Sequence, residues 1–214
     1  LISNYNLFVY DLDIKKSKNL IKKGAYLCSS IRELSTKSSI IITCLPSPKA
    51  VSDVVEGSKG FIKYINNNHL WIEMSTTDEI EMIRLSELVK EKGGETLEAP
   101  VTGGQHRAKT GNISILVSGE RKNFERALPV LTEIGYEILF CGKIGNALTL
   151  KVITNYLASI NLLALGEALM VAKKYGINLS DAFSGIKISS GNSFVHETES
   201  KVILGGSYNV GFTM

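Results

Sequence analysis

The sequence predicts an α/β protein in which a doubly wound sheet is followed by an all-α domain. In the first two thirds of the chain, short apolar runs alternate with helical patterns, and most runs are followed by Gly, Pro, Ser or Asp. From about residue 146 onward the strand pattern stops and only helical patterns remain. We therefore predict a first domain over residues 1–145 and a helical second domain over residues 146–214.

The composition fits such a protein. The chain has 214 residues, of which 44% are hydrophobic, so a sizeable core can form. The net charge of +3 comes from basic and acidic residues that are interleaved along the chain, and this pattern argues against a nucleic-acid partner. The three cysteines and three histidines are widely spaced, and their spacing indicates neither a disulfide framework nor a metal site.

Strands and helices are predicted from the period of the apolar residues. The strands are expected at residues 7–10, 25–27, 40–44, 70–74, 95–98, 114–118 and 137–140. The helices are expected at residues 78–92, 122–134, 146–174, 179–188 and 194–204. The most apolar stretch, residues 156–171, is interrupted by Asn161, Gly166 and Glu167 and is too short to span a bilayer. No membrane partner is therefore expected.

The motif VYDLD (residues 9–13) is an apolar strand that ends in an acid and leads into a Lys-rich helix. In a Rossmann-like, dinucleotide-binding domain, this is where a carboxylate binds the adenosine ribose. Asp11 would accept hydrogen bonds from the ribose hydroxyls and repel a 2′-phosphate, so NAD is preferred while NADP stays possible. The alternative is that Asp11 or Asp13 is an ordinary helix N-cap.

Two further strand ends could line the same cofactor groove. Leu45 and Pro46 follow the strand IIITC, and Thr76 follows the strand ending in Glu73 and Met74. The simpler explanations are that proline stops the first strand and that Thr77 caps the next helix.

The motif EAPVTGG places a hydroxyl and two glycines, Thr102-Gly103-Gly104, between a strand and a helix. Glycines let a ligand approach the backbone, and N–H groups at a helix N-terminus suit a carboxylate. A plain glycine turn is the alternative. Further on, Lys151 and Asn155 lie four residues apart in an apolar helical pattern, so both point to one side of the helix. Lys151 either extends its amine to solvent or is held for chemistry.

With these motifs in order, the sequence resembles the β-hydroxyacid dehydrogenase (3-hydroxyisobutyrate dehydrogenase) family over nearly its whole length. The motifs that carry the resemblance are VYDLD, TCLP, MST, APVTGG with AKTGNISILVSG, GKIGNALTLKVITN and ALGEALMVAKKYGI. The resemblance implies hydride transfer between NAD(P) and a short β-hydroxyacid. It implies that Lys151 is the catalytic lysine and that Asn155 helps to hold the substrate. It also implies that Thr102, Gly103 and Gly104 form the substrate-carboxylate loop, and that Asp11, Leu45, Pro46 and Thr76 contact the cofactor.

Several alternatives remain open within and outside this family. Sister enzymes reduce 2-hydroxy-3-oxopropionate (tartronate semialdehyde) or other semialdehydes, and a 6-phosphogluconate enzyme would need a basic phosphate site that the sequence does not suggest. A non-catalytic binding protein or an inactive fragment is the alternative of another class, because the family's glycine-rich loop and C-terminal helices are missing. The apolar helix from Asn146 leads us to expect a homodimer or homotetramer. The expected location is cytoplasmic, or the mitochondrial matrix in a eukaryote.

Overall fold

The computed structural model describes residues 1–207, apart from the side chains of Gln105, His106 and Lys201. The chain divides into two compact units, Leu1–Lys151 and Val152–Met214. The division falls inside helix α7 (Asn146–Lys174), so the first turns of this helix belong to the first unit. The sequence placed the boundary just before this helix.

The first unit is built on a sheet whose strand order is β3-β4-β5-β7-β6, with β8 paired to β7. Strands β3, β4 and β5 run parallel, whereas β7 is antiparallel to β5 and β6 and parallel to β8. The bounds are Ile40–Thr43 (β3), Leu70–Glu73 (β4), Glu95–Glu98 (β5), Val101–Thr102 (β6), Ser114–Gly119 (β7) and Glu137–Phe140 (β8). Strand β6 was not predicted, because it is very short and forms only through its pairing with β7.

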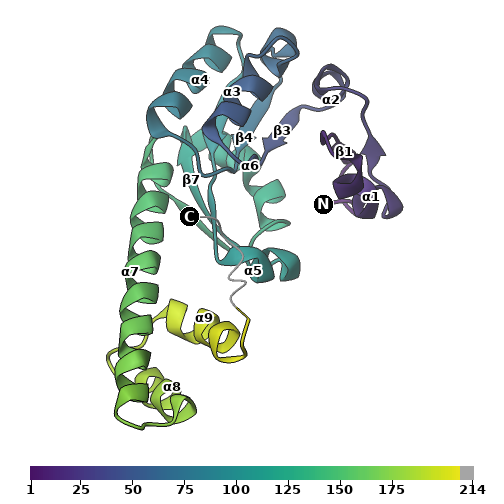
Figure 1. Ribbon diagram of the computed structural model, residues 1–214. Coiled ribbons are helices and arrows are strands. Elements are labelled where there is room, and N and C mark those ends of the chain that lie inside the picture. Colours follow the sequence, from purple (N-terminus) through teal and green to yellow (C-terminus); the bar gives the residue numbers. More distant parts are fainter. Residues whose placement is uncertain (208–214) are drawn as a thin grey trace. The chain divides into compact units, whose positions relative to one another are not determined.

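The predicted strands at residues 7–10 and 25–27 are shorter in the structure and form a small sheet of their own. They are β1 (Phe8–Val9) and β2 (Tyr26–Leu27), which pair in parallel. Figure 1 shows them at the N-terminal end of the unit, beside α1 (Ile14–Lys22) and α2 (Ile31–Lys37).

Helices cover both faces of the main sheet, which confirms the doubly wound prediction. Along β4, Trp71 contributes to one core cluster, and Leu70 and Ile72 contribute to the other, because successive strand side chains point to opposite faces. The first cluster includes side chains of α3 (Pro48–Val55), the 3-10 helix Phe61–Tyr64, α4 (Glu79–Glu91) and the start of α7. The second includes those of α6 (Arg121–Thr132).

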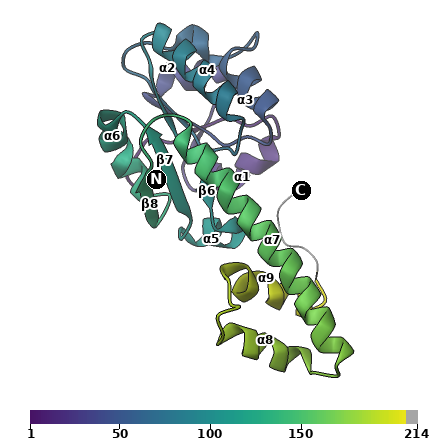
Figure 2. The same ribbon diagram turned by 90° about the vertical axis from the view of Figure 1, so that its left-hand side faces the viewer.

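The second unit is helical throughout its described part, as predicted. It contains the remainder of α7, α8 (Leu179–Lys187) and α9 (Phe194–Leu204) (Figure 2). The buried ring of His196 joins the two shorter helices: its Nε2 lies 2.9 Å from the carbonyl oxygen of Phe183, and its Nδ1 lies 3.0 Å from Ser200 Oγ.

Helix α7 is more apolar than the sequence interpretation allowed. An 18-residue window has a mean hydropathy of 1.4, so by length and composition alone this helix could cross a membrane, and only 17% of the window is buried. The polar residues that interrupt residues 156–171 are too few to lower the mean below that of a membrane span. The prediction that no stretch of the chain is long and apolar enough to span a bilayer was therefore wrong, as judged by length and composition alone.

Candidate active site

Asp11 follows β1 and is not the cap of the next helix. The cap of α1 is Asp13, whose side chain accepts a hydrogen bond from the N–H of Lys15. Asp11 is half-buried, and its Oδ1 accepts a hydrogen bond from the Asp13 N–H at 2.8 Å. The two acids therefore have separate tasks: Asp13 starts the helix, and Asp11 has a second carboxylate oxygen that can bind another group.

The ends of β3 and β4 are joined by a buried hydrogen-bond network. The N–H of Leu45 donates to Ser75 Oγ at 2.7 Å, and the N–H of Ser75 donates to Glu73 Oε1 at 2.6 Å. Thr43 Oγ1 donates to the other oxygen of Glu73 and accepts from Trp71 Nε1. This network brings the predicted Leu45-Pro46 segment next to the loop that carries Thr76.

Glu73 is a residue that the sequence reasoning missed. It is 1% exposed, and this burial raises the pKa of its carboxyl, while the hydrogen bonds from Ser75 and Thr43 act in the opposite direction. The available signal was an acid at the last position of an otherwise apolar strand. Its two carboxylate oxygens join the end of β3 to the loop after β4, which carries the predicted cofactor residue Thr76.

The loop after β4 has exposed positions and one buried hydroxyl without a hydrogen-bond partner among the described residues. Pro46 and Thr76 are exposed. The hydroxyl of Thr77 is buried and has no hydrogen-bond partner among the described residues. The simpler explanation, in which Thr77 caps α4, is wrong. The cap is Asp78, whose side chain accepts a hydrogen bond from the N–H of Glu81. An unpartnered hydroxyl at the carboxyl ends of parallel strands fits a dinucleotide cofactor.

Thr102 lies in β6, opposite Ser114, and Gly103 and Gly104 follow it at the start of α5 (Gly104–Thr110). Gly103 has a φ of 121°, and a Cβ there would lie 2.8 Å from Cδ of Arg107. Among the described residues no side chain caps α5. The loop therefore has a conformation that glycine favours, with backbone N–H groups that suit the predicted carboxylate.

The first turn of α7 is held by a second buried glutamate, Glu98. Its Oε2 accepts from the N–H of Gly145 at 2.9 Å. Its Oε1 accepts from the N–H groups of Ala147 at 2.7 Å and Leu148 at 3.1 Å. Burial raises the pKa of the Glu98 carboxyl, while these donors act against the rise.

Lys151 lies on the next turn of α7 and is 8% exposed. This burial lowers the pKa of its amine, because the charged form loses hydration. The simpler interpretation, in which Lys151 extends its amine to solvent, does not hold for a residue that is this buried. Asn155 is one turn further along the same helix and is exposed.

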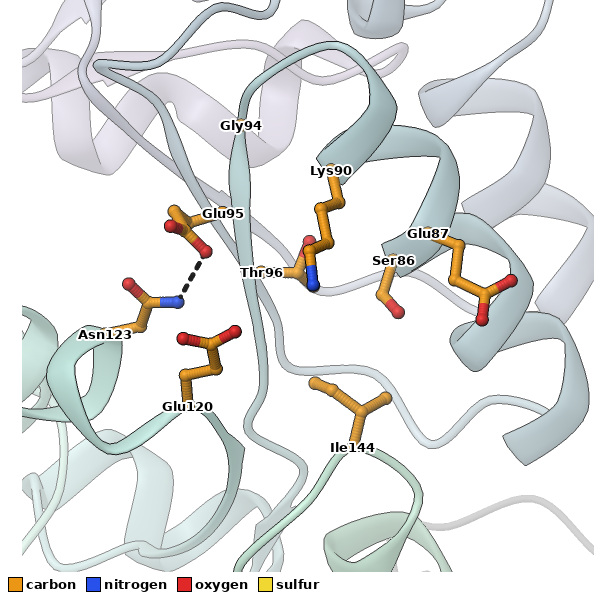
Figure 3. Close-up of a pocket in the computed structure, with 9 residues that line it drawn as sticks. All are labelled: Ser86, Glu87, Lys90, Gly94, Glu95, Thr96, Glu120, Asn123 and Ile144. Carbon is orange, nitrogen blue, oxygen red and sulfur yellow. Dashed lines mark hydrogen bonds between the residues drawn. The ribbon is translucent and has the colours of Figure 1, made fainter.

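A shallow cleft of about 150 Å³ lies elsewhere on the first unit and contains none of the predicted site residues (Figure 3). Two of its lining side chains bind each other, because Asn123 Nδ2 donates to Glu95 at 2.9 Å. Glu95 also pairs at 2.8 Å with Lys122, which lies outside the lining. Among the described residues, no group of histidine, cysteine and acidic side chains is suited to a metal ion.

Comparison with known proteins gives two family matches that together cover most of the chain. Residues 1–142 match the NAD binding domain of 6-phosphogluconate dehydrogenase. Residues 145–214 match the domain described as NAD-binding of NADP-dependent 3-hydroxyisobutyrate dehydrogenase. The chain thus has an NAD(P)-binding fold.

Curated relatives agree with these matches. The chain is 29% identical to 2-(hydroxymethyl)glutarate dehydrogenase of Eubacterium barkeri, over 97% of this chain and 69% of that protein. It is also 29% identical to mitochondrial 3-hydroxyisobutyrate dehydrogenase of Mus musculus, over 92% of this chain and 59% of that protein. A solved structure described as Psf3 in complex with NADP+ and 2-OPP has the same fold, with a TM-score of 0.91 and 22% identity over 98% of this chain and 74% of that one.

Proposed function

The chain belongs to the β-hydroxyacid dehydrogenase family of NAD(P)-dependent dehydrogenases and reductases. We propose that Lys151 is the acid–base group for a short β-hydroxyacid such as 3-hydroxyisobutyrate. The observation that carries the proposal is the burial of Lys151, since it lowers the pKa of the amine. A lysine serves as a base near neutral pH only when its pKa is lowered in this way.

The residues at the carboxyl ends of β1, β3 and β4 would hold the cofactor. Asp11 would accept hydrogen bonds from the ribose hydroxyls, Leu45 and Pro46 would line the groove, and Thr76 would contact the cofactor beside the unpartnered hydroxyl of Thr77. When bound, NAD(P) supplies a two-electron acceptor or donor for hydride.

The remaining steps belong to the chain's own residues. The amides of Thr102, Gly103 and Gly104 would bind the substrate carboxylate. During oxidation the neutral Nζ of Lys151 takes the proton of the β-hydroxyl as the carbonyl forms. During reduction the protonated amine returns a proton to that oxygen. Asn155 would orient the substrate and donate a hydrogen bond to the same oxygen.

Replacing Lys151 by alanine tests the assignment. In the full-length protein, Lys151→Ala should lower kcat by about 10²–10⁴-fold, as expected for the loss of a general acid–base group. Lys173→Ala is the matched control, because this lysine is exposed in the last turn of the same helix and should leave kcat within about twofold. Near-normal turnover by Lys151→Ala would reject the proposed role.

Asp11 is proposed to favour NAD, because its carboxylate repels a 2′-phosphate. In Asp11→Ala, the ratio of kcat/KM for NAD to that for NADP should fall by about tenfold, which corresponds to about 1.4 kcal/mol. Asp13→Ala removes the neighbouring carboxylate, which only caps α1, and should leave the ratio unchanged. A ratio that is the same in Asp11→Ala and the wild type would reject the preference.

Self-association is proposed to cover the second part of α7 with a second copy of the chain, giving a homodimer or homotetramer. Residues 152–166 carry no charged side chain, so two copies of this surface can pack against each other without charge repulsion. Exposed apolar side chains on this part of the helix are Val152, Ile153, Tyr156, Leu157, Ile160 and Leu163.

A further inference from the structure

Glu98 connects the two sequence motifs that carry the candidate site. It is the first residue of EAPVTGG, the motif that ends in the Thr102-Gly103-Gly104 loop. Its side chain accepts hydrogen bonds from Gly145, Ala147 and Leu148, which start the helix of Lys151. The two motifs are separated by about forty residues in the sequence, and this one carboxylate joins them.

The contacts of Glu98 fix the N-terminus of α7, so we call this carboxylate the anchor of the helix. The side chain is fully buried, and three backbone N–H groups at a helix start donate to its two oxygens. Ser118 on β7, which pairs with Glu98 in the sheet, adds a second acceptor for the Ala147 N–H, at 2.8 Å from its Oγ. These N–H groups would otherwise be buried without partners, because the first N–H groups of a helix have none within it.

We infer that Glu98 is a positioning residue for the proposed reaction: by holding the first turn of α7, it sets where the Lys151 amine lies relative to the Thr102–Gly104 loop. The inference rests on the proposed function of Lys151. It goes beyond a capping role, because Lys151 is buried and lies only one turn after the anchored amides, so a shift of that turn would shift its amine.

Glu73 shows that burial of an acid at a strand end does not by itself give this role. Glu73 and Glu98 are register partners on β4 and β5, so their side chains leave the same face of the sheet. Glu73 binds Thr43 and Ser75, which belong to the β3–β4 side, whereas Glu98 binds the start of α7. Of these two glutamates, Glu98 is the one whose side chain binds the start of the helix that carries Lys151.

The test is Glu98→Gln in the full-length protein, read in two ways. The first is the pH dependence of Lys151 labelling by an amine-reactive acylating reagent, followed by mass spectrometry, which needs no turnover. The glutamine side chain places an NH₂ group where the backbone N–H groups need an acceptor. The first turn of α7 should therefore loosen, and the Lys151 amine should become more exposed to water. The pH midpoint of labelling should move up toward that of an ordinary lysine. The second is kcat, which should fall by about tenfold or more.

Leu97→Ala is the matched control. Leu97 is buried next to Glu98 on β5 but belongs to the opposite core cluster, so its loss should lower the melting temperature without changing the Lys151 midpoint. Should Glu98→Gln not fold, Ser118→Ala removes the second acceptor of the Ala147 N–H and should give a smaller upward shift.

The outcomes separate this inference from the proposed function. An unchanged Lys151 midpoint in folded Glu98→Gln, or in folded Ser118→Ala if the glutamine variant does not fold, would overturn the positioning role even if kcat fell. A wild-type protein without turnover, whose Lys151 midpoint still shifts in Glu98→Gln, would leave the anchor in place and reject the proposed reaction.

Discussion

The two parts of helix α7 bury their side chains to very different degrees. In the first part, Ala147, Leu148 and Lys151 are all less than 9% exposed, and Glu98 holds the backbone. In the second part, which belongs to the other unit, Leu163 is 63% exposed and Met170 is 66% exposed. One continuous helix, α7 in Figure 1, therefore combines a buried end that carries the candidate chemistry with an apolar stretch whose side chains are largely exposed.

The apolar residues of α7 therefore have two different environments. Near its start they are buried together with Lys151, and burial is the physical cause of the lowered pKa of that amine. Those further along are mostly exposed in the single chain. We propose that a second copy of the chain covers them, because an exposed apolar helix face suits an interaction surface.

A matched pair of leucines on α7 tests the comparison most strongly. Leu148→Ala should lower the free energy of unfolding by about 2–5 kcal/mol, because a fully buried leucine leaves a cavity. Leu163→Ala should change it by less than about 0.5 kcal/mol in dilute solution, where no second copy covers the helix. Chemical denaturation at low protein concentration measures both. Equal losses would show that the second part of α7 is covered within one chain.

Self-association tests the second part of the helix, and we expect a smaller effect. Leu163→Asp should weaken the association measured by sedimentation by about tenfold, or about 1.4 kcal/mol, because a charge would be placed in an apolar contact. Lys174→Glu, at the end of the same helix, should have little effect. Flotation with lipid vesicles distinguishes the remaining explanation. A chain that stays monomeric and floats with vesicles would show that α7 contacts lipid instead of a second copy.

Local patterns were sufficient to predict most elements of the fold. Strands β5 and β8 and helices α7 and α9 have the predicted bounds. The period of their apolar residues and the glycines or caps at their ends can be recognised from neighbouring residues alone. Strand β6 and the separate pairing of β1 with β2 were missed. Such short strands depend on a partner elsewhere in the chain, and no local pattern reveals it.

The candidate site was predictable in its residue types and less so in its supports. Lys151 stood out as a charge in an apolar helix, and Asp11 stood out as an acid at a strand end. Glu73 and Glu98 looked like ordinary polar endings of apolar strands. Their functions come from partners that are about thirty and about fifty residues away, at Thr43 and at the start of α7. Contacts at this separation exist only once the sheet has formed.

The role of Lys151 is tested most directly by the pH dependence of NAD(P)-linked turnover in the full-length protein. Nicotinamide absorbance would monitor this turnover with a panel of short β-hydroxyacids and semialdehydes. The neutral amine of Lys151 is needed for oxidation. We therefore expect the oxidation rate to rise with pH through a midpoint below the ordinary pKa of lysine, and the reduction rate to fall through the same range. A folded protein that binds NAD(P) but turns over no member of the panel would reject the proposed function.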